Sequence, residues 1–231
     1  MENERIDRIK KHFEEAAEKY DIVIQKLIPH YNQMVEALVS VIPFSKENGF
    51  SAIDLGCGTG TISQSVKNEF PNITITCVDI SANMLEIARN KIGGNITCIQ
   101  ADFNSFVFLQ KYDLIISSLA LHHLENDDEK LEFYKKIYSS INRGGVFINI
   151  DVVLGNDDFI QEQYMKKWRE FLEEKLSSEE TEKCMSDYYA EDRPTKLITH
   201  LDMLRECGFT NIDVIYKIFN FAVYAAMKNE K

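Results

Sequence analysis

The feature that most constrains this chain is a glycine-rich turn that follows an apolar segment. Residues 52–60 read Ala-Ile-Asp-Leu-Gly-Cys-Gly-Thr-Gly, so that glycine stands at every second position from Gly56 to Gly60. Glycine has no Cβ and tolerates positive φ, which lets such a loop pass within contact distance of a ligand. Residues 61–66 read as the beginning of a helix. The unit is therefore a strand, a glycine turn and a helix N-terminus, an arrangement suited to ligand binding.

The spacing of the glycines argues against a dinucleotide cofactor. The dinucleotide fingerprint G-x-G-x-x-G would require glycine at position 61, where the chain has Thr61. A second acidic residue, Asp79, ends the β-branched run 73–79, about 20 residues after the glycines, where a ribose-binding carboxylate belongs. A carboxylate can accept hydrogen bonds from both ribose hydroxyls. Asp79 is therefore the strongest single candidate for ligand contact.

Over residues 50–152 the order and spacing of these motifs resemble the seven-strand, Rossmann-like S-adenosylmethionine (SAM)-dependent methyltransferases. The resemblance rests on the motif 54–60, on the acid-aromatic pair Asp102-Phe103 after a third strand, and on a fourth strand at 112–119. A glycine turn at 142–148 resembles the one that precedes strand five in that family. The resemblance implies SAM as the cofactor and S-adenosylhomocysteine as the product.

The same resemblance assigns roles to individual residues. Asp102 and Phe103 would bracket the adenine, and Ser118 lies where the sheet opens under the sulfonium. Asp54 would organise the glycine loop and reach the amino group of the ligand, or serve only as a scaffold for the loop. Phe13 and Tyr20 resemble the N-terminal aromatic lid that covers the cofactor in small-molecule methyltransferases, with a core contact as the favoured interpretation for Phe13. The predicted cofactor-binding residues are Tyr20, Asp54, Gly56, Cys57, Gly58, Gly60, Asp79, Ile80, Met84, Asp102, Phe103 and Ser118.

Two adjacent histidines, His122 and His123, follow the fourth strand. Neighbouring residues do not share a face of a helix, so we expect at most one of them to point into the site. His123 is the candidate general base, with a packing or capping role as the alternative. His122 and His123 together with Asp151 and His200 have side chains that suit a divalent transition ion. No short ligand spacing supports such a site, and no metal is predicted.

The two ends of the chain resemble a more specific family, the carboxy-SAM synthases, in residues 21–31 and 219–226. That family transfers no methyl group in its own reaction and holds the extra carboxylate with a helix arginine. In the matching run 199–205, Met203 stands at the position of that arginine, and Arg205 follows two residues later. An uncharged thioether cannot pair with a carboxylate, which favours ordinary SAM.

Composition limits the classes of partner and the compartment. The net charge of −11 disfavours nucleic acid, because affinity for phosphates comes from lysine and arginine. The five cysteines are odd in number and lack C-x-x-C spacing, which predicts free thiols in a reducing cytoplasm. No apolar run reaches membrane-spanning length. We expect a cytoplasmic protein with a small-molecule substrate, and the sequence does not predict an oligomeric state.

The predicted fold class is α/β, with a Rossmann-like, seven-stranded, mostly parallel sheet that carries helices on both faces. Residues 1–45 form an N-terminal helical cap, with a break near Pro29. Residues 46–155 and 191–231 form the core, and 156–190 are inserted as a lid of two helices. A helix at 199–207 begins at a capping box of Thr199 and Asp202. An antiparallel hairpin at 212–227 completes the sheet.

The predicted function is SAM-dependent methyl transfer to a small-molecule acceptor by in-line displacement. One alternative is an enzyme similar to the carboxy-SAM synthases. The other is a protein that binds SAM without catalysis and regulates a partner.

Overall fold

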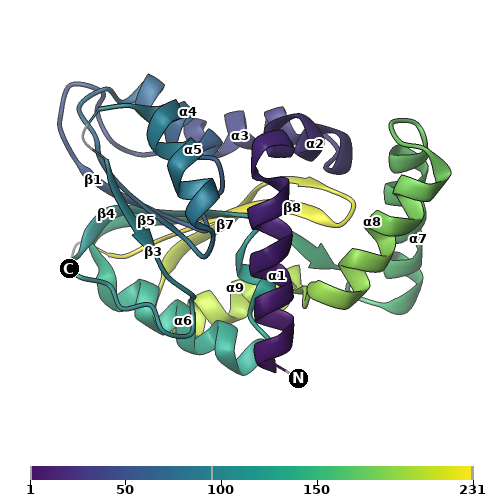
Figure 1. The fold of residues 1–231 in the computed structure, drawn as a ribbon. Coiled ribbons are helices and arrows are strands. Elements are labelled where there is room, and N and C mark those ends of the chain that lie inside the picture. Colours follow the sequence, from purple (N-terminus) through teal and green to yellow (C-terminus); the bar gives the residue numbers. More distant parts are fainter. Residues whose placement is uncertain (1, 95, 230–231) are drawn as a thin grey trace.

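The computed structural model describes residues 2–94 and 96–229, which form a central sheet between layers of helices (Figure 1). The sheet has the order β3-β2-β1-β4-β5-β8-β7, and β6 pairs with β5 outside that path. Neighbouring strands from β3 to β5 are parallel, whereas β8 is antiparallel to β5 and β7. The strands are β1 (Ser51–Leu55), β2 (Thr74–Asp79), β3 (Thr97–Gln100), β4 (Tyr112–Ser118), β5 (Ile141–Leu154), β6 (Thr195–Lys196), β7 (Thr210–Ile218) and β8 (Phe221–Met227).

Helices cover both faces of the sheet. Helices α3, α4 and α5 pack on one face, whereas α6 and α9 pack on the other (Figure 1). The helices are α1 (Glu2–Ala16), η1 (Ala17–Lys19), α2 (Tyr20–Leu27), α3 (Tyr31–Ser40), α4 (Thr61–Glu69), α5 (Ala82–Ile92), η2 (Leu121–His123), α6 (Asp127–Ser140), α7 (Asp158–Glu173), α8 (Ser178–Glu191) and α9 (Leu197–Glu206).

The apolar strand sequences follow from this two-sided cover. In β1 and β4, Ala52 and Leu114 pack with α3, α4 and α5, whereas Ile53 and Ile115 pack with α6 and α9. Successive residues of a strand point to opposite faces, so a parallel sheet with helices on both sides requires continuous apolar runs.

Most of the predicted architecture is confirmed. The main path of the sheet has seven strands, β7 and β8 form the C-terminal hairpin, and α7 and α8 occupy the predicted insertion. The N-terminal helical segment breaks between α2 and α3, at Pro29 and His30, where His30 has φ 58°. Proline and the left-handed residue together end one helix and begin the next.

The beginning of α9 differs from the prediction. The helix begins at Leu197, its N-cap is Lys196, and no side chain caps it. Thr199 and Asp202 therefore lie inside the helix and form no capping box. The physical reason is that β6 (Thr195–Lys196) pairs with β5 and runs directly into α9, which fixes the helix start two residues earlier than the local pattern suggests.

Gly60 joins the glycine loop to α4 and packs closely on α5. It has φ +81°, and a Cβ at this position would lie 2.9 Å from Ala88 Cβ and from Ile92 Cδ1. We therefore expect Gly60→Ala to lower the free energy of unfolding by about 1–2 kcal/mol for the left-handed backbone, and by about 1–3 kcal/mol more for the overlap.

The matched control is Gly58→Ala in the same loop. Gly58 also has positive φ, but its added Cβ would meet Tyr20 Cε1 at an ordinary 3.7 Å. Urea unfolding should show a smaller loss for Gly58→Ala than for Gly60→Ala. Equal losses would mean that contact with α5 contributes nothing.

Candidate functional site

The carboxyl ends of β1, β2, β3 and β4 meet at one cavity, on the side of the sheet where the strand order reverses. Ligands of open α/β sheets bind at such a point, because the loops there separate to opposite faces. Helix α1 and Tyr20 of α2 supply the remaining wall. The cavity is lined by Ile6, Ile9, Phe13, Tyr20, Gly56, Gly58, Asp79, Ile80, Ala101, Asp102, Phe103, Asn104, Ser118, Leu119, Ala120, His123 and Leu124.

The glycine loop is held tightly against the loop that follows β4. A Cβ on Gly56 would lie only 2.3 Å from Ala120 Cβ, and Gly56 has φ +72°. No other residue type therefore fits there without displacing the chain. The backbone N–H of Gly58 donates a hydrogen bond of 2.7 Å to Asp79 Oδ2, which ties the loop to the end of β2.

Asp79 ends β2 at the wall of the cavity. It is 7% exposed, lines the cavity, and its Oδ1 accepts a 2.9 Å hydrogen bond from Ser81 N–H. Burial raises the pKa of Asp79 to about 6, against the lowering effect of the backbone donors of Ser81 and Gly58. Each carboxylate oxygen has a second lone pair, so a ribose hydroxyl can still donate to each one.

The pair Asp102 and Phe103 follows β3 and lines the same cavity. Asp102 Oδ1 accepts a 2.6 Å hydrogen bond from Asn104 N–H, which fixes the turn. The ring of Phe103 lies 5.1 Å from that of Phe133, on the side of α6. The carboxylate and the ring are thus brought together at the cavity wall, as the adenine prediction requires.

The structure places eight of the predicted cofactor-binding residues in the cavity wall and four behind it. Asp54, Cys57, Gly60 and Met84 do not line the cavity. Asp54 is fully buried and its Oδ2 accepts a 2.6 Å hydrogen bond from Ser63 Oγ. This position fits the scaffold alternative for Asp54, because its described partner lies on α4 within the loop unit.

Sequence reasoning expected the N-terminal helices to cover the site but did not specify which face of α1 would do so. Ile6, Ile9 and Phe13 line the cavity, a position that fits the lid alternative for Phe13 better than a core contact alone. These residues recur with helical spacing, which indicates one apolar face but not what that face covers. The signal was present in the sequence, whereas its target depends on tertiary packing.

A second cavity of about 340 Å³ adjoins the first. The two share Phe13, Tyr20, Leu119 and His123 as a common wall. The second cavity lies among α1, α2, α7 and α8, and its remaining lining residues are His12, Val23, Ile24, Lys26, Leu27, Ile28, His122, Val152, Trp168, Leu176, Glu180, Lys183, Cys184, Asp187, Tyr188, Glu191, Asp192 and Phe221. Its volume is in the range of sites for small organic molecules.

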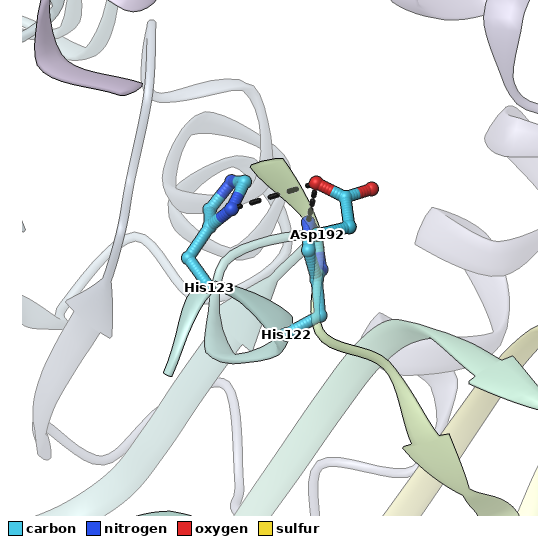
Figure 2. A group of neighbouring side chains, drawn as sticks. All are labelled: His122, His123 and Asp192. Carbon is cyan, nitrogen blue, oxygen red and sulfur yellow. Dashed lines mark ion pairs between the residues drawn. The ribbon is translucent and has the colours of Figure 1, made fainter. Parts of the chain in front are cut away.

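Both adjacent histidines line this second cavity, and Figure 2 shows the two rings beside Asp192. The prediction that at most one would point into the site holds for the first cavity, which only His123 reaches, but it is wrong for the second. The two residues belong to a single 3-10 turn, η2, rather than to an α-helix, and their ring centroids are 4.2 Å apart. The cavity wraps around this turn, so that both rings meet it.

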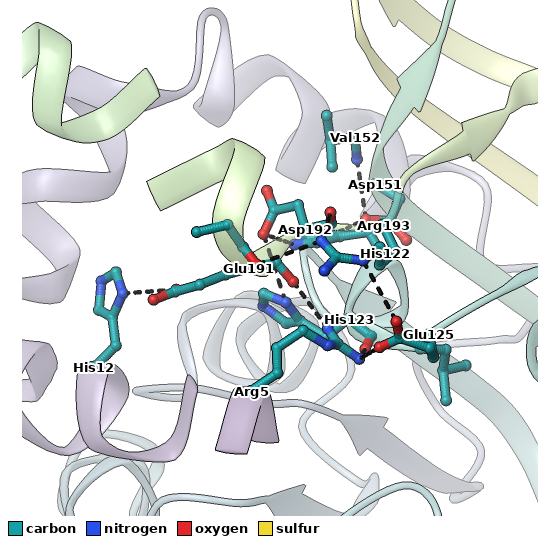
Figure 3. Close-up of polar contacts among 12 residues, drawn as sticks. Arg5, His12, His122, His123, Glu125, Asp151, Val152, Glu191, Asp192 and Arg193 are labelled. Carbon is teal, nitrogen blue, oxygen red and sulfur yellow. Dashed lines mark hydrogen bonds and ion pairs between the residues drawn. The ribbon is translucent and has the colours of Figure 1, made fainter. Parts of the chain in front are cut away.

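His122 lies between two carboxylates (Figure 3). Its Nδ1 is 2.5 Å from Asp151 Oδ1, and its Nε2 is 3.4 Å from Asp192 Oδ1. Burial lowers the pKa of His122, but the charges of Asp192 and Asp151 outweigh this and raise the pKa to about 10. His122 is therefore a buried imidazolium at neutral pH.

His123 has the opposite electrostatic environment. Burial and then the charge of His122 lower the pKa of His123 to about 3. Neither ring nitrogen has a hydrogen-bond partner among the described residues, and Nδ1 is 3.5 Å from Asp192 Oδ1. The ring of Phe13 meets it edge-on at 5.7 Å. His123 is thus a neutral imidazole with a free lone pair in the wall between the cavities.

The nearest atoms of His122, His123 and Asp192 that could bind a metal lie within 4.8 Å of one another. Of the four residues considered for a metal from the sequence, Asp151 bonds to His122, whereas His200 lies deeper and contacts Tyr134 OH at 2.7 Å. Asp192 was not among the candidates, because nothing in its local sequence distinguishes it from the neighbouring acids.

Helix α1 is tied over the cavities by polar contacts to distant segments (Figure 3). Arg5 donates hydrogen bonds of 2.9 Å to the carbonyls of Glu191 and His123 and pairs with Glu125. His12 Nδ1 lies 2.9 Å from Glu191 Oε2. These contacts join α1 to η2 and to the end of α8.

The structure places Met203 away from both cavities. Met203 is buried in the apolar cluster under α6 and α9, and Arg205 points to solvent, where it pairs with Asp202. Among the described residues that line the first cavity there is no lysine or arginine. A carboxylate added to the cofactor would therefore find no cationic side chain in that wall.

Comparison with known proteins shows what the chain is similar to. Residues 52–145 match the family described as methyltransferase domain. The chain is 27% identical to the carboxy-S-adenosyl-L-methionine synthase of Sulfurimonas denitrificans, over 95% of this chain and 96% of that protein. It is 31% identical to malonyl-[acyl-carrier protein] O-methyltransferase 1 of Ilyobacter polytropus, over 60% of this chain and 49% of that protein.

Among solved structures, the DhpI–SAM–HEP complex superposes with a TM-score of 0.67 at 16% identity, over 96% of both chains. The predicted resemblances to the SAM-dependent methyltransferases and to the carboxy-SAM synthases are thus both confirmed. No helix in the described part of the chain combines the length and the apolar character needed to cross a bilayer.

We expect Asp79→Ala to weaken SAM binding roughly 10²- to 10⁴-fold, because it removes two hydrogen bonds to a charged acceptor that are each worth about 1.5–3 kcal/mol. Calorimetric titration of SAM into the wild type and the variant measures this. The matched control is Glu86→Ala, which removes an exposed carboxylate from the adjacent helix α5 and should leave the affinity unchanged. Equal affinity of Asp79→Ala and wild type would contradict the ribose assignment.

Proposed function

We propose that this chain, whose residues 52–145 form a methyltransferase domain, binds SAM in the first cavity and transfers its methyl group to a small molecule in the second. The observation that carries the proposal is the common wall of the two cavities. A methyl donor in one and an acceptor in the other would meet beside Leu119 and His123.

The first cavity supplies the contacts that SAM requires. We assign the ribose to Asp79, the adenine to Asp102 and Phe103, and the methionine end to the glycine loop and Ser118. The relatives and the solved SAM complex with the same fold support this assignment. The residues behind the wall, such as Asp54 and Met84, hold the loop and α5 in place.

The protein's main contribution to methyl transfer would be alignment and the exclusion of water. The sulfonium is already a strong methyl donor, so in-line positioning of the acceptor accounts for most of the catalysis. Charge leaves the sulfur as the methyl group moves, and a dry, covered site favours that transition state. The apolar rings of Phe13 and Tyr20 cover the point of transfer. His123 would hold the reacting group of the acceptor through its free nitrogen.

Two segments act as covers in this proposal. Residues 1–45 supply the cap, because α1 and α2 line both cavities, and residues 156–190 supply the lid, because α7 and α8 line the second one. Residues 46–155 and 191–231 would form the SAM-binding core between them. We assign the protein to the cytoplasm, where its free cysteines would stay reduced.

The principal alternative is synthesis of carboxy-SAM. The full-length similarity to carboxy-SAM synthases supports it. The buried position of Met203 and the absence of cationic side chains among the described lining residues of the first cavity argue against it. The third candidate, a SAM-binding protein without catalysis, would leave the second cavity without a purpose.

The mass of a nucleoside that co-purifies with the protein separates the first two functions. We expect SAM or S-adenosylhomocysteine rather than a species heavier by one CO₂. Incubation with methyl-labelled SAM and a panel of oxygen, nitrogen, sulfur and carbon acceptors should then transfer label. Carboxy-SAM in the purified protein would contradict the proposal.

A further test addresses His123. We expect His123→Ala to lower the rate of methyl transfer at saturating substrate about 10²-fold or more, because the acceptor loses its polar contact at the point of transfer. SAM affinity should change much less, since Asp79 and the glycine loop remain. Similar turnover in the variant and the wild type would exclude a catalytic role.

A further inference from the structure

The inner end of the second cavity presents a carboxylate at the point where the two cavities meet. Asp192 Oδ1 lies 3.4 Å from His122 Nε2 and 3.5 Å from His123 Nδ1. Both distances exceed the ordinary N–H···O length of about 2.9–3.0 Å, so these contacts leave room for a shorter bond from a ligand. The side chain of Asp192 is 17% exposed and faces the cavity beside His123.

The charges around Asp192 leave it incompletely balanced. His122 is shared between Asp192 and Asp151, so that one imidazolium faces two carboxylates. The other nearby cations already have partners: Arg5 and Arg193 pair with Glu125, and His12 pairs with Glu191. Lys130 donates to the backbone carbonyls of Leu124 and Arg193 and does not line the cavity.

The outer part of the cavity has a different character. Lys26, Lys183 and Glu180 line it with exposed side chains, and Asp187 is half-buried. These charges of both signs lie in high-dielectric surroundings, where each contributes little. At the inner end, where the carboxylates of Asp192 and Asp151 share the imidazolium of His122, the sign of a ligand's charge therefore matters most.

Aromatic side chains surround the same space. Trp168, Tyr188 and Phe221 line the cavity together with Phe13 and Tyr20. Trp168 meets Tyr188 and Phe221 edge-on at centroid distances of 5.2 and 5.7 Å, and its Nε1 is held by the carbonyl of Leu27 at 2.8 Å. The faces of such rings attract cations and pack against apolar groups.

We propose that the acceptor is an amine with an apolar or aromatic body, bound as its ammonium ion by Asp192. This inference rests on the proposed function and names the acceptor class for it. The body of the amine fills the space among Trp168, Tyr188 and Phe221, and its nitrogen lies between Asp192 and His123. A carboxylate-bearing acceptor would be repelled at this end, and a neutral one would add no second cation beside Asp192.

The chemistry balances with the groups present. The ammonium first loses one proton to solvent, and the nearby sulfonium charge favours that loss. The freed nitrogen lone pair then attacks the methyl carbon of SAM. The C–N bond forms as the C–S bond breaks, and the electron pair of that bond returns to sulfur. The products are an N-methylammonium ion and S-adenosylhomocysteine.

Calorimetric titration of the protein saturated with S-adenosylhomocysteine tests the proposal. The probes are phenethylamine, its neutral analogue 2-phenylethanol and its anionic analogue phenylacetate. We expect the amine to bind at least about 10-fold more tightly than the alcohol, and the acid to bind most weakly. Only the amine should accept label from methyl-labelled SAM.

Asp192→Asn is the informative variant. It should remove the preference for the amine over the alcohol while leaving S-adenosylhomocysteine binding intact, which also shows that the variant is folded. The matched control is Glu162→Gln, which neutralises an exposed carboxylate of the covering helix α7 and should retain the preference.

Three outcomes overturn the inference in different ways. Methyl transfer to neutral or anionic acceptors without any preference for amines would refute the acceptor class and leave the proposed function standing. Failure of the wild type to bind SAM would remove both. Stoichiometric binding of Zn²⁺ that Asp192→Asn abolishes, with no binding of amine, would assign His122, His123 and Asp192 to a metal ion instead.

Discussion

The parallel pairing of β1 between β2 and β4 is the constraint on which the rest of the molecule depends. Leu55 lies in register with Val78 on one side and with Ser117 on the other. Beyond this register, the N–H groups of Gly56 and Cys57 both donate to the carbonyl of Val78, and Ser117 Oγ donates to the carbonyl of Leu55. The carboxyl ends of β1, β2 and β4 are therefore held level with one another. The glycine loop, Asp79 and the residues after β4 consequently lie together at one edge of the sheet.

Helices α1, α2, α7 and α8 cover this edge of the sheet and supply walls of the two cavities. Helix α1 spans both, and its ties through Arg5 and His12 reach residues more than 100 positions away in the sequence. The glycines matter for the same reason, because Gly56 allows two loops to approach more closely than any side chain would permit. The fold thus places two cavities on opposite sides of one shared wall.

The electrostatic environment differs sharply between neighbouring residues at that wall. The two adjacent histidines differ in charge because Asp151 and Asp192 flank one of them, whereas burial and the neighbouring cation act on the other. The shared cation His122 holds η2, β5 and the end of α8 together, and the neutral imidazole of His123 lies in the wall between the two cavities. A buried charge is tolerated here because its partners are also buried and lie close to it.

The sequence by itself determined the sheet, the glycine loop and the position of the acid at the end of β2. Glycine spacing and acids at strand ends are local patterns, because each depends on backbone geometry within one strand-turn-helix unit. Eight of the twelve predicted cofactor residues line the cavity. The errors have one physical origin. The start of α9, the facing of His122 and His123, and the roles of Phe13 and Asp192 depend on which distant segments pack together. Only the tertiary structure decided them, since neither a helical period nor a single acid specifies its partner.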